Sequence, residues 1–124
     1  MSEFVKYLLA AFLGAFITSQ AMAGDADFTL INRTGHDIES VYVAPSRSTN
    51  WGSDRLGDRV LADGRSLLVE FSKGNRDCVY DIKVHWVGYG EADDSIWERI
   101  DLCLIHRITL RYNRRTNVTS ADLE

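Results

Sequence analysis

The sequence predicts an all-β protein, a small antiparallel β-sandwich of the immunoglobulin-like kind with about seven strands. Three observations predict this fold. Apolar and polar residues alternate with a period of two in four separate runs, the pattern of half-buried strands. Turn-forming residues separate the runs at intervals of about 8 to 12 residues, and no run after residue 24 has a helical period. The only two cysteines, Cys78 and Cys103, lie at the two ends of one predicted hairpin.

The first 23 residues have the layout of a secretory signal peptide. An apolar run from Tyr7 to Ile17 is followed by polar residues and by Ala21-Met22-Ala23, a small-residue cleavage site. Those 11 residues would rise about 1.5 Å each as a helix, too little to cross a bilayer core about 30 Å thick. We therefore predict cleavage after Ala23, a single domain at residues 24–124, and a periplasmic or secreted protein with no stable membrane insertion.

The predicted mature domain keeps the net charge of −4 of the whole chain, because Lys6 and Glu3 both leave with the leader. An acidic domain has no general attraction to nucleic acid, and we expect no nucleic-acid partner. In an oxidising compartment two cysteines predict a disulfide rather than a catalytic or metal-binding role. A disulfide between Cys78 and Cys103 would close a loop of about 25 residues, which stabilises the domain by about 3.5 kcal/mol in the chain-entropy model.

Residues 28–32 and 37–44 form two predicted strands, joined as a hairpin by a turn that contains Gly35. Pro45 ends the second strand because it has no amide hydrogen to donate. The segment from Pro45 to Asp58 is a polar loop whose one large aromatic residue is Trp51. Two interpretations of Trp51 stay open: it folds back to plug one end of the sandwich, or it contacts a ligand or partner.

Residues 59–61 and 66–72 are the next strand-like runs, separated by an Asp63-Gly64 turn. In the second run Leu67, Val69 and Phe71 are predicted to face the core.

The central hairpin runs from Cys78 to about Trp86 and returns from about Ser95 to Cys103. A register in which partner numbers sum to 181 pairs the two cysteines and also sets Lys83 against Glu98 and Val84 against Trp97, both stabilising pairs. Tyr80, Ile82, Val84 and Trp86 share one face. The return strand is apolar on both faces, so it either lies between layers or contains a bulge.

The last predicted strand is Arg107 to Asn113, with Ile108, Leu110 and Tyr112 facing inward. The tail after Arg115 has little apolar content and is predicted to fray. The basic run Arg107, Arg111, Arg114 and Arg115 has two interpretations: charges that stop another strand from pairing with an edge, or a site for an anionic envelope polymer or acidic partner.

Three motifs recur along the predicted mature chain: N-x-TG-x-x-I at Asn32 to Ile38, WG-x-x-x-LG at Trp51 to Gly57, and C-x-x-DI-x-V at Cys78 to Val84. With these motifs the chain resembles a family of small exported proteins of alphaproteobacteria and their relatives. Members are mostly uncharacterised. Some carry the label argininosuccinate lyase, but those lyases are long, helical and tetrameric, and a small β domain cannot supply their active site. The resemblance implies export and a β fold and adds no mechanism.

No catalytic, nucleotide-binding or metal-binding motif is present, and we predict no catalytic residue, no metal and no cofactor. His36, His85 and His106 are scattered, so a zinc site would need three distant segments to converge. Two acidic groups lack the spacing of a calcium loop: Asp54 with Asp58, and Glu91, Asp93 and Asp94. Asp81, flanked by Tyr80 and Ile82, needs an internal partner if it is buried; the partner is an arginine in the simplest interpretation.

These observations favour a non-enzymatic exported binding or interaction module, with the Trp51 loop as its contact surface and an envelope protein or polymer as its partner. The candidate binding residues are Trp51, Asp54, Asp81, Arg107 and Arg111. The alternatives are a small hydrolase or lyase and a structural envelope protein. A cleft in which two titratable side chains converge would favour an enzyme. The sequence predicts no oligomeric state.

Overall fold

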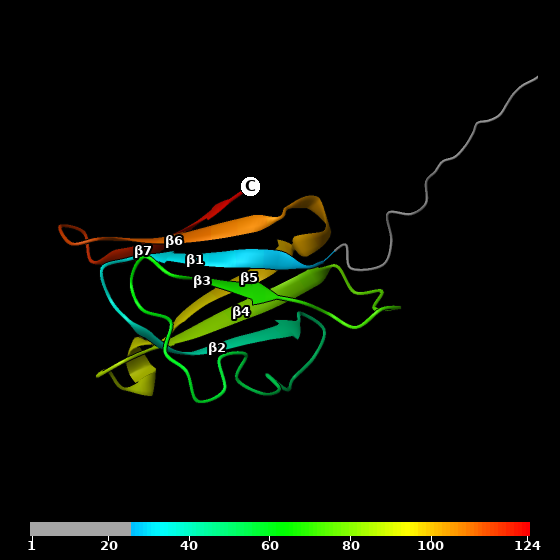
Figure 1. The fold of residues 1–124 in the computed structure, drawn as a ribbon, viewed down its shortest axis with the longest axis horizontal. Helices are drawn as coiled ribbons and strands as arrows, with labels where there is room; N and C mark the ends of the chain where they lie inside the picture. Colours follow the sequence, from blue (N-terminus) through cyan, green and yellow to red (C-terminus); the bar gives the residue numbers. More distant parts are fainter. Residues whose placement is uncertain (1–25) are drawn as a thin grey trace, which may run out of the picture.

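The computed structural model describes residues 26–124 as two facing β-sheets (Figure 1). One sheet has four strands in the order β3-β1-β6-β7, and the other has three in the order β2-β4-β5. The strands are β1 (Phe28–Arg33), β2 (Ile38–Pro45), β3 (Ser66–Val69), β4 (Val79–Trp86), β5 (Ser95–Asp101), β6 (Arg107–Asn113) and β7 (Val118–Leu123). The predicted seven-stranded sandwich is confirmed.

Only two short 3-10 turns interrupt the strands in the described part of the chain: η3 (Glu91–Asp93) and η4 (Leu102–Leu104). Among residues 26–124 no helix has the length and apolar content needed to span a membrane. The predicted signal peptide at residues 1–23 lies outside the described residues.

The core fills the space between the sheets with side chains from alternate strand positions. On β4 the predicted face is confirmed, because Tyr80, Ile82, Val84 and Trp86 are all buried. The inward positions Leu67 and Val69 of β3 are buried too. The four-stranded sheet contributes most of the opposite wall of the core: Phe28, Leu30, Ile108 and Leu110.

The predicted hairpin of β1 and β2 is wrong, because the two strands belong to different sheets. β1 pairs with β3 and, in parallel, with β6, whereas β2 pairs with β4. The connection crosses between layers around the fully buried side chain of Asn32. Its amide donates to the carbonyls of His36 (2.8 Å) and Leu61 (3.0 Å), and its Oδ1 accepts from Thr34 Oγ1 (2.7 Å). The N-x-TG motif therefore holds a layer-to-layer turn, in which Gly35 has a φ of +83°.

The predicted strand at residues 59–61 reduces to a single bridge between Leu61 and Ile38.

The predicted register of the central hairpin is also wrong. Tyr80 lies opposite Ile100, and after a bulge Lys83 lies opposite Ile96 rather than Glu98. Arg99 has a φ of 59° in this bulge, and its amide donates to Asp81 Oδ1 at 2.9 Å. The bulge changes the phase of β5, which explains why its sequence is apolar on both faces.

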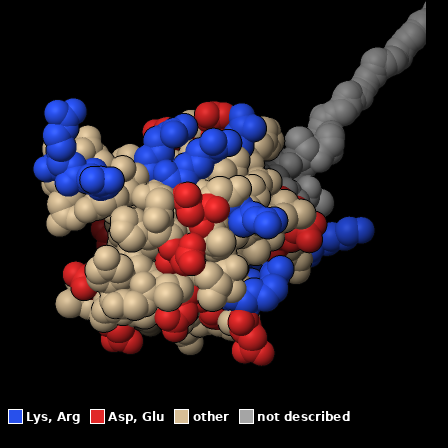
Figure 2. Space-filling model, turned by 60° about the vertical axis from the view of Figure 1, so that its left-hand side comes forward, with Lys and Arg blue, Asp and Glu red and all other residues tan. Residues whose placement is uncertain are grey.

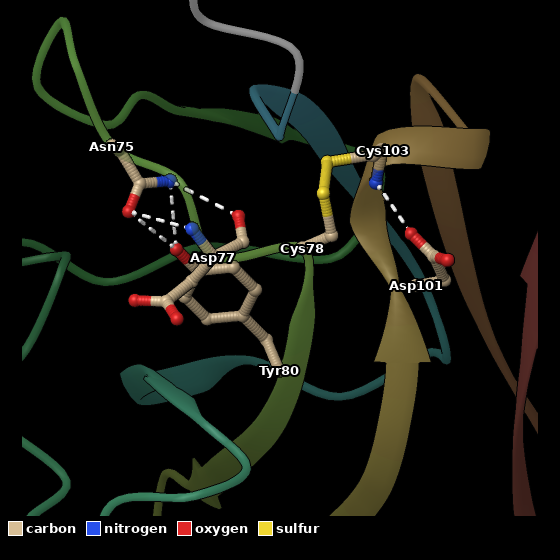
Figure 3. The surroundings of a disulfide bond; sticks show 6 residues. All are labelled: Asn75, Asp77, Cys78, Tyr80, Asp101 and Cys103. Carbon is tan, nitrogen blue, oxygen red and sulfur yellow. Dashed lines mark hydrogen bonds between the residues drawn. A yellow bond between two sulfur atoms is a disulfide. The ribbon is translucent and has the colours of Figure 1, made fainter.

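The predicted Cys78–Cys103 disulfide is confirmed, with an S–S distance of 2.05 Å and a Cα–Cα distance of 5.2 Å. It joins the residue before β4 to η4, which follows β5 (Figure 3). Neighbouring strands of one sheet are thus linked, unlike the inter-sheet disulfide of immunoglobulin domains. The amide of Cys103 donates to Asp101 Oδ1 at 3.1 Å.

The tail predicted to fray forms β7, which pairs with β6 over six positions, from Ile108 opposite Leu123 to Asn113 opposite Val118. Exposed ion pairs add to this pairing: Arg111 Nε donates to Asp122 Oδ2 at 2.7 Å, and Arg107 pairs with Glu124. β6 therefore lies between β1 and β7 and is not an edge strand. The interpretation of its arginines as edge protection is wrong.

Candidate ligand cleft between β5 and β7

The β2–β3 loop, residues 46–65, covers the outer edge of β2. Asp54 Oδ1 accepts hydrogen bonds from the amides of Val41 and Leu56, both at 2.9 Å, and the amide of Arg55 donates to the carbonyl of Val41 at 2.7 Å. Leu56 then enters the core, where it is 4% exposed. The Asp54 carboxylate therefore has a structural role: it accepts hydrogen bonds from backbone amides at the edge of the sheet that would otherwise lack a partner.

Trp51 does not plug the sandwich, because Leu56 is the loop side chain that lies in the core. The half-buried Trp51 ring lies 5.1 Å from Lys83 Nζ, and the ring of Tyr42 lies 5.0 Å from the same ammonium group. Both aromatic rings thus make cation–π contacts with Lys83.

Asp81 finds neutral partners rather than an arginine. Its Oδ1 accepts from Ser46 Oγ at 2.6 Å and from the amide of Arg99 at 2.9 Å. These two bonds tie the start of the β2–β3 loop and the β5 bulge to β4. Arg107 and Arg111 lie in the other sheet, so the predicted binding residues do not converge on one site.

A cleft of about 530 Å³ opens between β5 and β7, the outer strands of the two sheets. Five aromatic rings line it, and they come from four separate segments: His36, Trp86, Tyr89, Trp97 and Tyr112. A volume of this size is typical of small-molecule sites, which span about 300–1,000 Å³.

His36, in the turn between β1 and β2, is the common neighbour of three of these rings. Its ring centroid lies 5.1 Å from that of Tyr112, 6.2 Å from that of Tyr89 and 6.4 Å from that of Trp86, each in an edge-to-face arrangement. Edge-to-face contacts of this kind stabilise aromatic clusters by about 0.5–1.5 kcal/mol per pair. The cluster is therefore a preformed surface. Tyr89 remains 50% exposed, whereas Trp86 is only 7% exposed.

Polar side chains complete the lining of the cleft. Ser95 Oγ accepts from Trp86 Nε1 at 3.1 Å, and Tyr112 donates its hydroxyl hydrogen to Asn117 Oδ1 at 2.7 Å. Within residues 26–124 no hydrogen bond engages Asn117 Nδ2, Thr119 Oγ1 or the carboxylate of Asp93. These groups are free to bind a ligand.

The loop that carries Asp93 is anchored to β4 by a hydrogen bond of 2.6 Å between His85 Nδ1 and Asp94 Oδ1. Both side chains are largely covered, at 20% and 9% exposed. This hydrogen bond raises the pKa of His85, against a smaller opposing effect of burial. The pair fixes η3 and with it one rim of the cleft.

The charged side chains outside the cleft form no single-sign field. Figure 2 shows basic side chains along the upper part of one face and at its right side, and acidic side chains from the middle of this face to its lower edge, with uncharged surface among them. A surface of mixed sign gives weak long-range steering of charged molecules.

Among the described residues, the single group of three side chains with ligand atoms close enough to share a metal ion is Cys78, Asp101 and Cys103. Both sulfurs are joined in the disulfide, so neither is available as a thiolate. The acidic side chains of residues 91–94 do not form such a group.

Comparisons with family models, with curated proteins and with solved structures find no match for this chain. No local sequence pattern indicates the cleft residues, because they come together only through the topology. His36, Trp97 and Tyr112 lie on a turn and on two strands of different sheets. The one sequence feature that pointed to this site was the presence of aromatic residues near the ends of predicted strands. Such residues follow no fixed spacing, so they form no recognisable motif.

Proposed function

We propose that this protein is a small exported binding module without catalytic activity and that its ligand site is the cleft between β5 and β7. The observation that carries the proposal is the combination, in one recess, of partly exposed aromatic rings with polar groups that have no hydrogen-bond partner among residues 26–124. Binding sites of small ligands have this composition. The disulfide and the predicted leader support export, because disulfides persist in oxidising compartments.

The proposal moves the contact surface from the Trp51 loop to the cleft. Trp51, Asp54 and Asp81 already have partners within the fold. Arg107 and Arg111 are paired with carboxylates of the C-terminal segment. A ligand at any of these groups would have to displace an existing contact, whereas the groups in the cleft need only exchange water.

The lining favours binding over hydrolysis or lyase chemistry. An enzyme of either class needs a nucleophile or base that a neighbouring group activates. The titratable non-tyrosine side chains of the cleft are His36 and Asp93, and no hydrogen bond joins them in the described part of the chain. His36 Nδ1 instead lies 3.3 Å from the carbonyl oxygen of Thr34.

The three tryptophans provide an internal test, because Trp86 and Trp97 line the cleft and Trp51 does not. We would add periplasmic extract to the ¹⁵N-labelled mature protein and follow the three indole N–H signals. The proposal predicts that the signals of Trp86 and Trp97 shift or broaden while that of Trp51 stays in place.

The variant Tyr89→Ala removes a half-exposed ring and should abolish the response without unfolding the protein. Trp51→Ala is the matched control and should retain it. Movement of the Trp51 signal alone, or no movement with extract, would reject the cleft as the site.

A further inference from the structure

We infer that the cleft between β5 and β7 binds a neutral saccharide. The inference rests on the proposed function and names its ligand class. A sugar ring has an apolar face of C–H groups and a rim of hydroxyl groups that both donate and accept hydrogen bonds. The cleft offers a matching surface for each part.

The aromatic rings match the apolar face. Tyr89 and Tyr112 each contact His36 edge to face, and Trp97 is a further partly exposed ring of the lining. Aromatic side chains present rigid apolar area at low cost in side-chain entropy and prefer to pack against C–H groups through their π faces. Because Tyr89 and Tyr112 are both held against His36, they need little rearrangement to accept a ligand.

The polar rim matches the hydroxyl groups. Asn117 Nδ2 is a donor, the Asp93 carboxylate is an acceptor, and Thr119 Oγ1 is both. The Tyr112–Asn117 hydrogen bond fixes the amide of Asn117 in one orientation, with its oxygen used and its nitrogen available. The His85–Asp94 pair holds the loop that presents Asp93. Donors and acceptors at fixed positions are what distinguishes one arrangement of hydroxyl groups from another.

The charge of the lining selects a neutral ligand over an anionic one. Of the described side chains that line the cleft, none is Lys or Arg, and the one full charge is that of Asp93. A phosphate or carboxylate group placed there would be desolvated next to a carboxylate, which is unfavourable. The arginines of β6 do not compensate, because Arg107 and Arg111 pair with Glu124 and Asp122.

The edge of β5 argues against an extended peptide as the occupant. A peptide that adds a strand needs a regular row of free backbone groups. β5 contains a bulge at Arg99, which bends the strand and breaks the regular spacing of backbone groups along it. Bulges and charged residues such as Glu98 and Arg99 are the devices that block strand addition. The cleft therefore recognises its ligand through side chains.

The first arm of the test uses defined probes. We would titrate the ¹⁵N-labelled mature protein with three neutral tetrasaccharides: a β-1,4-linked N-acetylglucosamine oligomer, a β-1,4-linked glucose oligomer and an α-1,4-linked glucose oligomer. Binding by any of them should move the indole signal of Trp97 and leave that of Trp51 unchanged. Tyr89→Ala should weaken this binding about tenfold or more, as expected for a central aromatic contact, and Trp51→Ala should not.

The second arm identifies the ligand class in periplasmic extract. One portion is treated with periodate, which cleaves the carbon–carbon bonds of vicinal diols, and the excess reagent is quenched. Because interior 1,4-linked N-acetylglucosamine units have no vicinal diol, this portion is then treated with chitinase and lysozyme, which are removed before mixing. Another portion is treated with protease, which is then inactivated. The inference predicts that the combined periodate and glycosidase treatment removes the response of the Trp97 signal and that protease does not.

The outcomes separate the two proposals. A response that survives the combined periodate and glycosidase treatment and is lost after protease would leave a binding module whose ligand is a polypeptide, and the saccharide inference would be overturned. A cleft that responds to neither the tetrasaccharides nor the untreated extract would overturn both.

Discussion

The β2–β3 loop contains two large apolar side chains, and the structure predicts very different consequences for their removal. Leu56 is 4% exposed and packs in the core. Trp51 lies outside the core, with its ring 5.1 Å from Lys83 Nζ. The variants Leu56→Ala and Trp51→Ala are therefore a matched pair within one loop.

The expected costs follow from these two environments. Truncating a buried leucine to alanine costs about 2–5 kcal/mol, because apolar contact is lost and a cavity remains. A cation–π contact contributes about 0.5–1 kcal/mol when exposed and about 2 kcal/mol when desolvated, and the half-buried Trp51 ring lies between these cases. We therefore expect Trp51→Ala to lower the free energy of unfolding by about 0.5–2 kcal/mol. A domain of this size has about 5–15 kcal/mol in total, so Leu56→Ala should remove a large share.

The assay is urea unfolding of residues 24–124 with the disulfide formed, followed by far-ultraviolet circular dichroism because one variant lacks a tryptophan. Both variants should keep the wild-type m-value, and the midpoint should fall much further for Leu56→Ala. In thermal melts each kcal/mol corresponds to about 4–8 °C for a domain of this length. A Trp51→Ala protein that is destabilised as much as Leu56→Ala would show that the indole anchors the loop, which would refute the assignment.

Three further predictions concern the disulfide, a buried amide and a histidine. Intact mass spectrometry of the purified, non-reduced protein should show a Cys78–Cys103 bond, and reduction should lower the free energy of unfolding by about 3.5 kcal/mol; two free thiols before reduction would contradict this. Asn32→Ala should cost about 1–3 kcal/mol or more in urea unfolding, because buried polar partners lose their hydrogen bonds; a cost below about 0.5 kcal/mol would contradict its role. His85 has a raised pKa, so its bond to Asp94 should stabilise the fold fully below the ordinary histidine pKa of about 6.5 and progressively less as the pH rises through the raised value. The difference in stability between wild type and His85→Gln should therefore shrink as the pH rises from about 6 to 8, and a constant or growing difference would reject this linkage.

The sequence predicted the fold class because alternation is a local property. A buried face such as that of Tyr80, Ile82 and Val84 follows from period two alone. The disulfide was predictable because the chain offers one pairing. The sheet to which β1 belongs was not predictable, because Asn32 looks like an ordinary turn residue in the sequence. Only the structure shows that its side-chain amide donates to the carbonyl of Leu61, in a distant segment.

The segment after Arg115 shows that amino-acid composition alone does not predict whether a chain end is ordered. Residues 118–123 contain few large apolar side chains, but pairing along β6 and the charge contacts of Arg107 and Arg111 order them. A strand at the edge of a sheet needs only one neighbour and a half-buried face, so low hydrophobicity does not exclude it.

The candidate site was harder to predict from the sequence than the fold class, because its residues meet only when the strand order is known. The bulge shifts Trp97 from its predicted position opposite Val84 to one opposite Ile82. It reaches the cleft only because β5 and β7 are both outer strands. Sequence analysis favoured Trp51 because a tryptophan in a polar loop stands out, whereas His36, Tyr89 and Tyr112 each resemble ordinary turn or strand residues.

Intermolecular nuclear Overhauser effects between residues 24–124 and the tightest-binding tetrasaccharide, or the saccharide fraction of periplasmic extract, test saccharide binding in the cleft most directly. Sugar C–H protons should show contacts to the ring protons of Tyr89, Trp97 and Tyr112. Contacts to Trp51 or to the arginines of β6, with none to the cleft rings, would contradict it.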